Sequence, residues 1–66
     1  MYGGKAMSLP KDPFMLMSYV NTQLRDNYSD LLELAASLGV SEEEIVRPLA
    51  DAGFTYNAEL NRFVAG

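Results

Sequence analysis

Three consecutive carboxylates, Glu42, Glu43 and Glu44, are the densest group of side chains in this sequence that could do chemistry. General acid/base catalysis needs two such groups that converge on one reacting atom and differ in acidity. Consecutive residues of a helix point about 100° apart, so these three fan outward and do not converge. Negative charge in the first turn of a helix is favoured by the helix dipole. We therefore expect the glutamates to stabilise a helix, not to catalyse a reaction.

The residue types present exclude most other site chemistry. The sequence has no cysteine and no histidine, so it offers neither thiolate nor imidazole as a nucleophile, general base or zinc ligand. It also lacks a phosphate-binding glycine loop, a nucleophile elbow and the spacing of an EF-hand. We therefore expect no catalytic residues, no cofactor and no metal site.

The spacing of Ala35, Gly39 and Ile45 is typical of a helix-turn-helix, in which two helices meet at a tight turn. In DNA-binding versions the second helix enters the major groove with its first residues against the bases. Here those residues are the three glutamates, and the chain has a net charge of −4, whereas DNA binding needs lysines and arginines that neutralise phosphates. We therefore expect a protein-interaction or structural module without catalysis, for which nucleic acid is not the partner. The alternative is a winged helix-turn-helix-like regulator that binds nucleic acid.

Four residues of the first predicted helix form a candidate interaction surface: Met15, Tyr19, Asn21 and Arg25. Met15 and Tyr19 are four residues apart, so they are neighbours on a helix, outside the stripe predicted to face the core. One interpretation is that the N-terminal arm or the C-terminal segment covers them. The other is that they form an exposed apolar patch for a partner protein or a second copy of the chain.

Asn21 and Arg25 are also four residues apart and share a different side of the helix. They could form a recognition patch. The structural alternative is that Asn21 bonds the backbone of a later hairpin or of the arm, while Arg25 pairs with a carboxylate such as Asp26 or Asp30.

The length and composition predict one small domain. A chain of 66 residues buries only ~60% of its unfolded surface, so its stability margin is thin. Residues 1–11 lack periodicity and predict a flexible N-terminal arm, and residues 12–66 predict a single helical domain with a C-terminal hairpin. The chain has neither an apolar run long enough to span a membrane nor a secretory signal pattern. We expect a soluble, cytoplasmic protein that associates with an unknown protein partner or with itself and not with a membrane.

Capping residues and apolar periodicity predict three helices. The first begins at Asp12-Pro13, because Asp12 suits the N-cap and Pro13 the first helical position, and it ends near Asp26-Asn27. Its core-facing stripe comprises Leu16, Met17, Val20, Leu24 and Tyr28, with Phe14 at the edge. The second helix has Ser29 as N-cap and runs to about Leu38, where Gly39 ends it in the left-handed conformation.

The third helix begins with a capping box formed by Ser41 and Glu44. Its inward residues are Ile45, Leu49 and Ala52, with Val46 beside them. Pro48 removes a backbone donor and predicts either a kink or a break, and Gly53 ends the helix.

After Gly53 the apolar pattern becomes alternating, which predicts a hairpin of residues 54–56 and 61–64 joined by residues 57–60. This pairing sets Phe54 opposite Phe63. The predicted fold is therefore mainly α: a three-helix, helix-turn-helix-like bundle with a short, wing-like C-terminal β-hairpin.

Two motifs are similar to those of a known family, the bacterial domain-of-unknown-function family 4250. Its opening motif resembles SLPKDPFMLMSYVNTQLRD at residues 8–26, and its closing motif resembles AGFTYNAELNRF at residues 52–63. The resemblance extends over about residues 7–64. It implies a small bacterial protein with no established activity, so it assigns no catalytic or binding residues.

Overall fold

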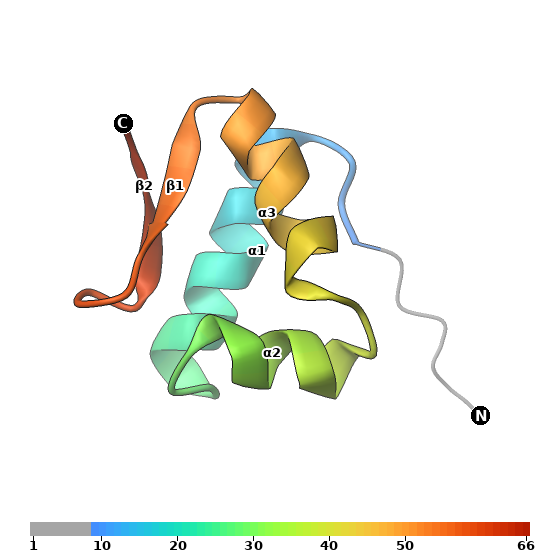
Figure 1. Ribbon diagram of the computed structural model, residues 1–66, viewed down its shortest axis with the longest axis vertical. Helices are drawn as coiled ribbons and strands as arrows, with labels where there is room; N and C mark the ends of the chain where they lie inside the picture. Colours follow the sequence, from blue (N-terminus) through green and yellow to red (C-terminus); the bar gives the residue numbers. More distant parts are fainter. Residues whose placement is uncertain (1–8) are drawn as a thin grey trace.

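The computed structural model describes residues 9–66, so most of the predicted N-terminal arm lies outside the described residues. Three helices are followed by one antiparallel hairpin, as predicted. The elements are α1 (Pro13–Asp26), α2 (Leu31–Leu38), α3 (Glu42–Asp51), β1 (Phe54–Asn57) and β2 (Arg62–Ala65). Figure 1 shows α1 and α3 running along the long axis, α2 lying across one end, and the hairpin along one side.

The first helix begins and ends where its caps predict. The Asp12 carboxylate accepts from the backbone amides of Phe14, at 2.8 Å, and Met15, at 3.2 Å, and Pro13 occupies the first turn. At the other end, the Asn27 amide donates to the Gln23 carbonyl at 2.8 Å.

The second helix begins one residue later than predicted, because Asp30 and not Ser29 is its N-cap. The Asp30 carboxylate accepts from the Glu33 amide at 2.8 Å. Ser29 lies just outside the helix, where its amide and hydroxyl both donate to the Glu33 carboxylate, at 2.9 and 3.0 Å. Both residue types suit an N-cap, but the charge of Asp30 also interacts favourably with the helix dipole.

The turn between α2 and α3 is formed as the sequence predicts. Gly39 has a φ of 75°, a conformation that disfavours residues with a Cβ. The Val40 amide donates to the Ala35 carbonyl at 3.0 Å, as in a Schellman motif. Ser41 and Glu44 form the predicted capping box, with N–H···O bonds of 3.3 and 2.8 Å.

The third helix continues through Pro48 to Asp51, so the predicted alternative of a break is wrong. Ile45 and Leu49 are buried as expected, but Ala52 is exposed. The reason is that the helix ends at Asp51 and Ala52 is its C-cap, so the helical periodicity no longer sets the direction of its side chain.

The hairpin has a different register from the predicted one. Its pairs are Phe54 with Ala65, Thr55 with Val64, Tyr56 with Phe63, and Asn57 with Arg62. The expectation that Phe54 lies opposite Phe63 is therefore wrong by two residues. A shift of two residues keeps the same side chains on the same face, so Phe54 and Phe63 are both still buried.

Two asparagines at the hairpin loop explain this register. Asn57 belongs to β1, and its side-chain oxygen accepts from the Leu60 amide at 3.0 Å, which closes the turn. Asn61 has a φ of 54°, a left-handed conformation that does not fit a strand. The four-residue loop is therefore residues 58–61, one residue later than predicted.

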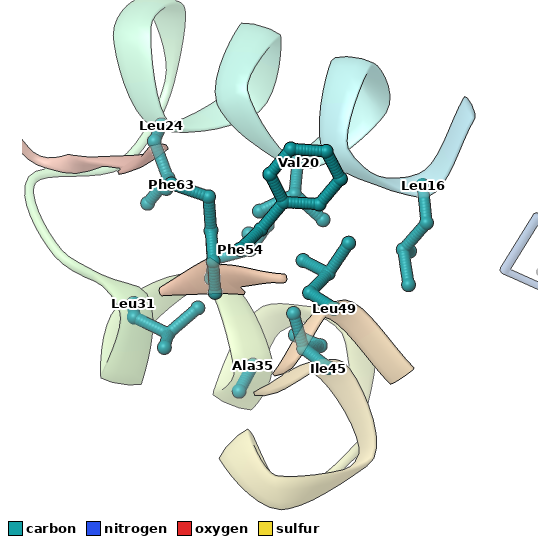
Figure 2. Close-up of a cluster of buried hydrophobic side chains, with 10 residues drawn as sticks. Leu16, Val20, Leu24, Leu31, Ala35, Ile45, Leu49, Phe54 and Phe63 are labelled. Carbon is teal, nitrogen blue, oxygen red and sulfur yellow. The ribbon is translucent and has the colours of Figure 1, made fainter. Parts of the chain in front are cut away.

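Side chains from all five elements converge on one apolar core (Figure 2). Its buried members are Leu16, Val20, Leu24, Leu31, Leu34, Ala35, Ile45, Leu49, Phe54 and Phe63. Among residues 9–66 no polar or charged side chain is buried. Apolar burial, worth about 25 cal/mol per Å², is therefore the main stabilising interaction between the elements.

Candidate functional site

An open groove of about 690 Å³ lies between α1 and the tip of the hairpin. Its lining comes from both elements: Met17, Ser18, Asn21, Thr22, Leu24, Arg25, Leu60, Asn61 and Arg62. Two of the predicted surface residues, Asn21 and Arg25, are part of this lining. The groove lies within the usual size range of ligand pockets, ~300–1,000 Å³.

Asn61 holds the hairpin tip against the end of α1. Its side-chain amide donates to the carbonyls of Leu24, at 3.2 Å, and Tyr28, at 3.1 Å. Its side-chain oxygen accepts from the Tyr56 hydroxyl at 2.6 Å. One side chain thus joins the groove's two walls, which fixes their separation.

Asn21 makes a second attachment, to the outer edge of β2. It accepts from the Phe63 amide at 2.7 Å and donates to the Phe63 carbonyl at 3.1 Å. The Gly66 amide donates to the Gly53 carbonyl, so these two residues form a hydrogen-bonded pair between the strands. Hydrogen-bonded and non-hydrogen-bonded pairs alternate along an antiparallel ladder. Phe63 therefore belongs to a non-hydrogen-bonded pair, and its backbone amide and carbonyl point away from β1. The Asn21 side chain therefore bonds the Phe63 amide and carbonyl as a third strand would. This is the predicted structural alternative, in which Asn21 bonds the backbone of the hairpin.

Arg25 forms an ion pair with Asp26 and not with Asp30. Its Nε and one Nη lie 2.9 and 3.1 Å from the two carboxylate oxygens. The side chains are 73% and 49% exposed. The hydrogen bond from Arg25 lowers the pKa of the Asp26 carboxyl, against a smaller opposing effect of desolvation, and Asp26 raises the pKa of Arg25.

Arg62 supplies the second positive charge of the groove. It is exposed at the start of β2 and has no ion-pair partner among residues 9–66. Leu60, in the turn before it, is 60% exposed. Leu60 and Arg62 were not among the predicted site residues, because only the packing of the hairpin brings them beside α1.

Met15 and Tyr19 do not line the groove, so the four predicted surface residues do not form one site. Met15 is 63% exposed. Tyr19 is half-buried and packs against the core. Phe14 is also largely exposed, and its ring meets the Phe54 ring edge-on, with centroids 5.5 Å apart.

The first turn of α3, which would face DNA in a helix-turn-helix, forms a separate hollow of about 390 Å³. Its polar groups already have partners within α3. Glu44 is part of the capping box, and Arg47 donates to the Glu43 carboxylate at 2.9 Å. Glu42, Glu43 and Glu44 are all exposed, so this surface is acidic.

Two other kinds of feature are absent from the described residues. Residues 9–66 contain no group of three or more potential metal ligands. None of the helices within this range has the length and hydropathy needed to cross a membrane.

Comparisons with known proteins identify the chain's family. No curated protein and no solved structure matches the chain. The model of a family described as a domain of unknown function (DUF4250) matches residues 10–63. Since this match covers most of the sequence, including both walls of the groove, the chain belongs to the DUF4250 family.

Proposed function

We propose that this protein is a non-catalytic interaction module that binds a segment of a partner protein in the groove between α1 and the hairpin tip. The observation that supports this proposal is the rigid attachment of the two walls by Asn21 and Asn61. A groove whose walls are already joined loses less conformational entropy on binding, which favours affinity.

The lining of the groove suits binding better than catalysis. Among residues 9–66, the ionisable side chains that line it are Arg25 and Arg62. An arginine stays protonated in proteins, so it cannot act as a general base. The amides of Asn21 and Asn61 are occupied by their structural bonds. What remains is a pair of cations, two hydroxyls and an apolar floor, a combination that recognises shape and charge.

Nucleic-acid binding is the weaker candidate. It is supported by the pairing of α2 and α3 across Gly39 and by the hairpin, which occupies the position of a wing. The exposed glutamates in the first turn of α3 oppose it, because phosphate contacts supply most of the affinity of DNA-binding proteins.

Site-directed photo-crosslinking tests the proposed docking surface. A photoreactive amino acid replaces Thr22, which is exposed in the groove, or Leu32, which is 65% exposed on α2 and outside it. In cells that express the protein natively, we expect a discrete adduct from position 22 and none from position 32. The adduct's protein, once purified, should bind the purified chain in solution.

Two outcomes would contradict the proposal. Identical adducts from both positions would show that the groove has no special role. A discrete adduct with nucleic acid at position 22, with salt-sensitive binding by the purified chain, would favour the alternative function.

A further inference from the structure

Two of the five basic residues of this acidic protein, Arg25 and Arg62, line the groove. The whole chain has nine acidic and five basic residues, yet the groove lining contains two arginines and no carboxylate. The third arginine, Arg47, lies on α3 among glutamates and is paired with Glu43. Arg25 is itself paired with Asp26, so Arg62 is the groove arginine whose charge has no ion-pair partner among residues 9–66. Its charge favours anionic groups in the groove, whereas the exposed glutamates disfavour them at α3.

Both groove arginines have donors that are available to a ligand. Asp26 uses the Nε and one Nη of Arg25, which leaves the other Nη without a partner among residues 9–66. Arg62 has its whole guanidinium available within the same range. Because a guanidinium presents its donors in a planar fork, carboxylates are well matched to these two side chains.

Between the arginines the groove also has an apolar contact surface. The Leu60 backbone amide donates to the Asn57 side-chain oxygen at 3.0 Å, and the Leu60 side chain is exposed. The half-buried Met17 also lines the groove, whereas Leu24 is only 2% exposed and adds little contact surface. A methionine adapts to different apolar shapes, so this surface suits the side chain of a leucine or similar residue.

These features fit one class of occupant better than others. A groove of about 690 Å³ accommodates a few residues of extended peptide. Two cations suffice for two carboxylates, but a nucleic-acid strand needs a longer row of phosphate contacts, which an acidic protein does not provide.

We infer that the groove binds an acidic peptide segment of the partner protein, in which carboxylates beside one apolar residue pair with Arg25 and Arg62 while the apolar side chain packs on Leu60. This inference rests on the proposed function, because it names the chemistry of the partner that docks there.

Nuclear magnetic resonance titration of the full chain tests the inference. The probe is a synthetic peptide with the sequence Asp-Glu-Leu-Glu-Asp, capped at both ends. We expect backbone amide shifts at Thr22, Leu60 and Arg62 that saturate on titration. The same peptide with lysine in place of each acidic residue should leave these amides unchanged.

Arginine variants identify the source of the affinity. Arg25→Ala and Arg62→Ala should each raise the dissociation constant by about twofold to fivefold, the range for exposed charge pairs. Arg25→Lys keeps the charge but loses the planar fork, so its dissociation constant should lie between those of the original chain and Arg25→Ala. Arg47→Ala is the matched control, because Arg47 is similarly exposed, at 71% against 73% for Arg25, and is also ion-paired, but lies outside the groove. It should leave the peptide affinity unchanged.

The results separate this inference from the proposed function. If the acidic peptide shifts no groove amides, or if Arg47→Ala weakens binding as much as Arg25→Ala, the inference is wrong. A partner found by crosslinking at position 22 could bind the double variant Arg25→Ala, Arg62→Ala as tightly as the original chain. That result would support the groove as the docking surface but would show that the groove does not select acidic segments. Saturable binding of an oligothymidylate at the same amides, in place of the peptide, would also overturn the inference.

Discussion

At the scale of single residues, side-chain amides connect the hairpin to the helices. Asn21 and Asn61 together make four hydrogen bonds to backbone atoms of Phe63, Leu24 and Tyr28. Within residues 9–66, no buried side chain is polar. Apolar contacts hold the hairpin against the helices, but they do not by themselves fix its position along them. The amide bonds supply that specificity, because each satisfies particular backbone groups.

Replacement of Asn21 by alanine should therefore cost stability. The change leaves the Phe63 amide and carbonyl without partners in a partly buried position, at a cost of about 1–3 kcal/mol in the free energy of unfolding. Urea denaturation followed by circular dichroism measures this loss. The control is Thr22→Ala on the neighbouring exposed position, which should change the free energy by less than about 0.5 kcal/mol. Equal effects of the two substitutions would show that the Asn21 bonds do not stabilise the hairpin.

The ion pair of Arg25 predicts a pH effect. Because Arg25 lowers the pKa of Asp26 in the folded protein, the pair favours folding above the ordinary aspartate pKa, and this contribution is lost as the pH falls through the lowered value. Carbon-detected titration of the Asp26 carboxyl should show the low pKa, and Arg25→Ala should raise it. Arg47→Ala should leave it where it was. An Asp26 pKa that does not respond to Arg25→Ala would mean that the pair is not populated in solution.

At the scale of elements, the structure shows which features could be predicted from the sequence. The capping box of Ser41 and Glu44 and the glycine turn at Gly39 were predicted correctly, because each motif closes within a few residues. The register of the hairpin was not, because it depends on Asn61, whose partners Leu24 and Tyr28 lie 37 and 33 residues away in the chain. Bonds of that kind cannot be read from local patterns.

Pro48 offers a test of strain within one element. The helix α3 continues through it, although a proline cannot donate to the carbonyl four residues earlier and costs about 3 kcal/mol in a helix interior. Pro48→Ala restores a backbone donor to the Glu44 carbonyl. The substitution also makes the unfolded chain more flexible, which lowers the gain in stability by about 0.4–1 kcal/mol. We expect a net increase of about 2 kcal/mol in the free energy of unfolding, measured by urea denaturation. A decrease would show that packing of the half-buried proline ring outweighs the missing bond.

At the scale of the whole molecule, the groove combines segments that are distant in sequence. Asn21 and Arg25 were predicted as surface residues from their helical spacing. The predicted interaction surface also included Met15 and Tyr19, which lie outside the groove. Helical periodicity predicts which residues share a side of α1, and it does not predict what packs against that side. Leu60 and Arg62 became part of the site only through the packing of the hairpin on the helices.

The small core makes the whole molecule sensitive to a single cavity. Leu49 is fully buried and joins α3 to the other elements (Figure 2). Leucine-to-alanine substitutions in a core cost about 2–5 kcal/mol, and a domain of this size is stabilised by only about 3–5 kcal/mol. We therefore expect Leu49→Ala to unfold most of the population at 25 °C, visible as collapse of the dispersed amide spectrum. Leu32→Ala removes the same atoms from a side chain that is 65% exposed, so it should remain folded. A folded Leu49→Ala protein would mean that stability comes from a source beyond this core, such as association between copies of the chain, which sedimentation of the same sample would detect.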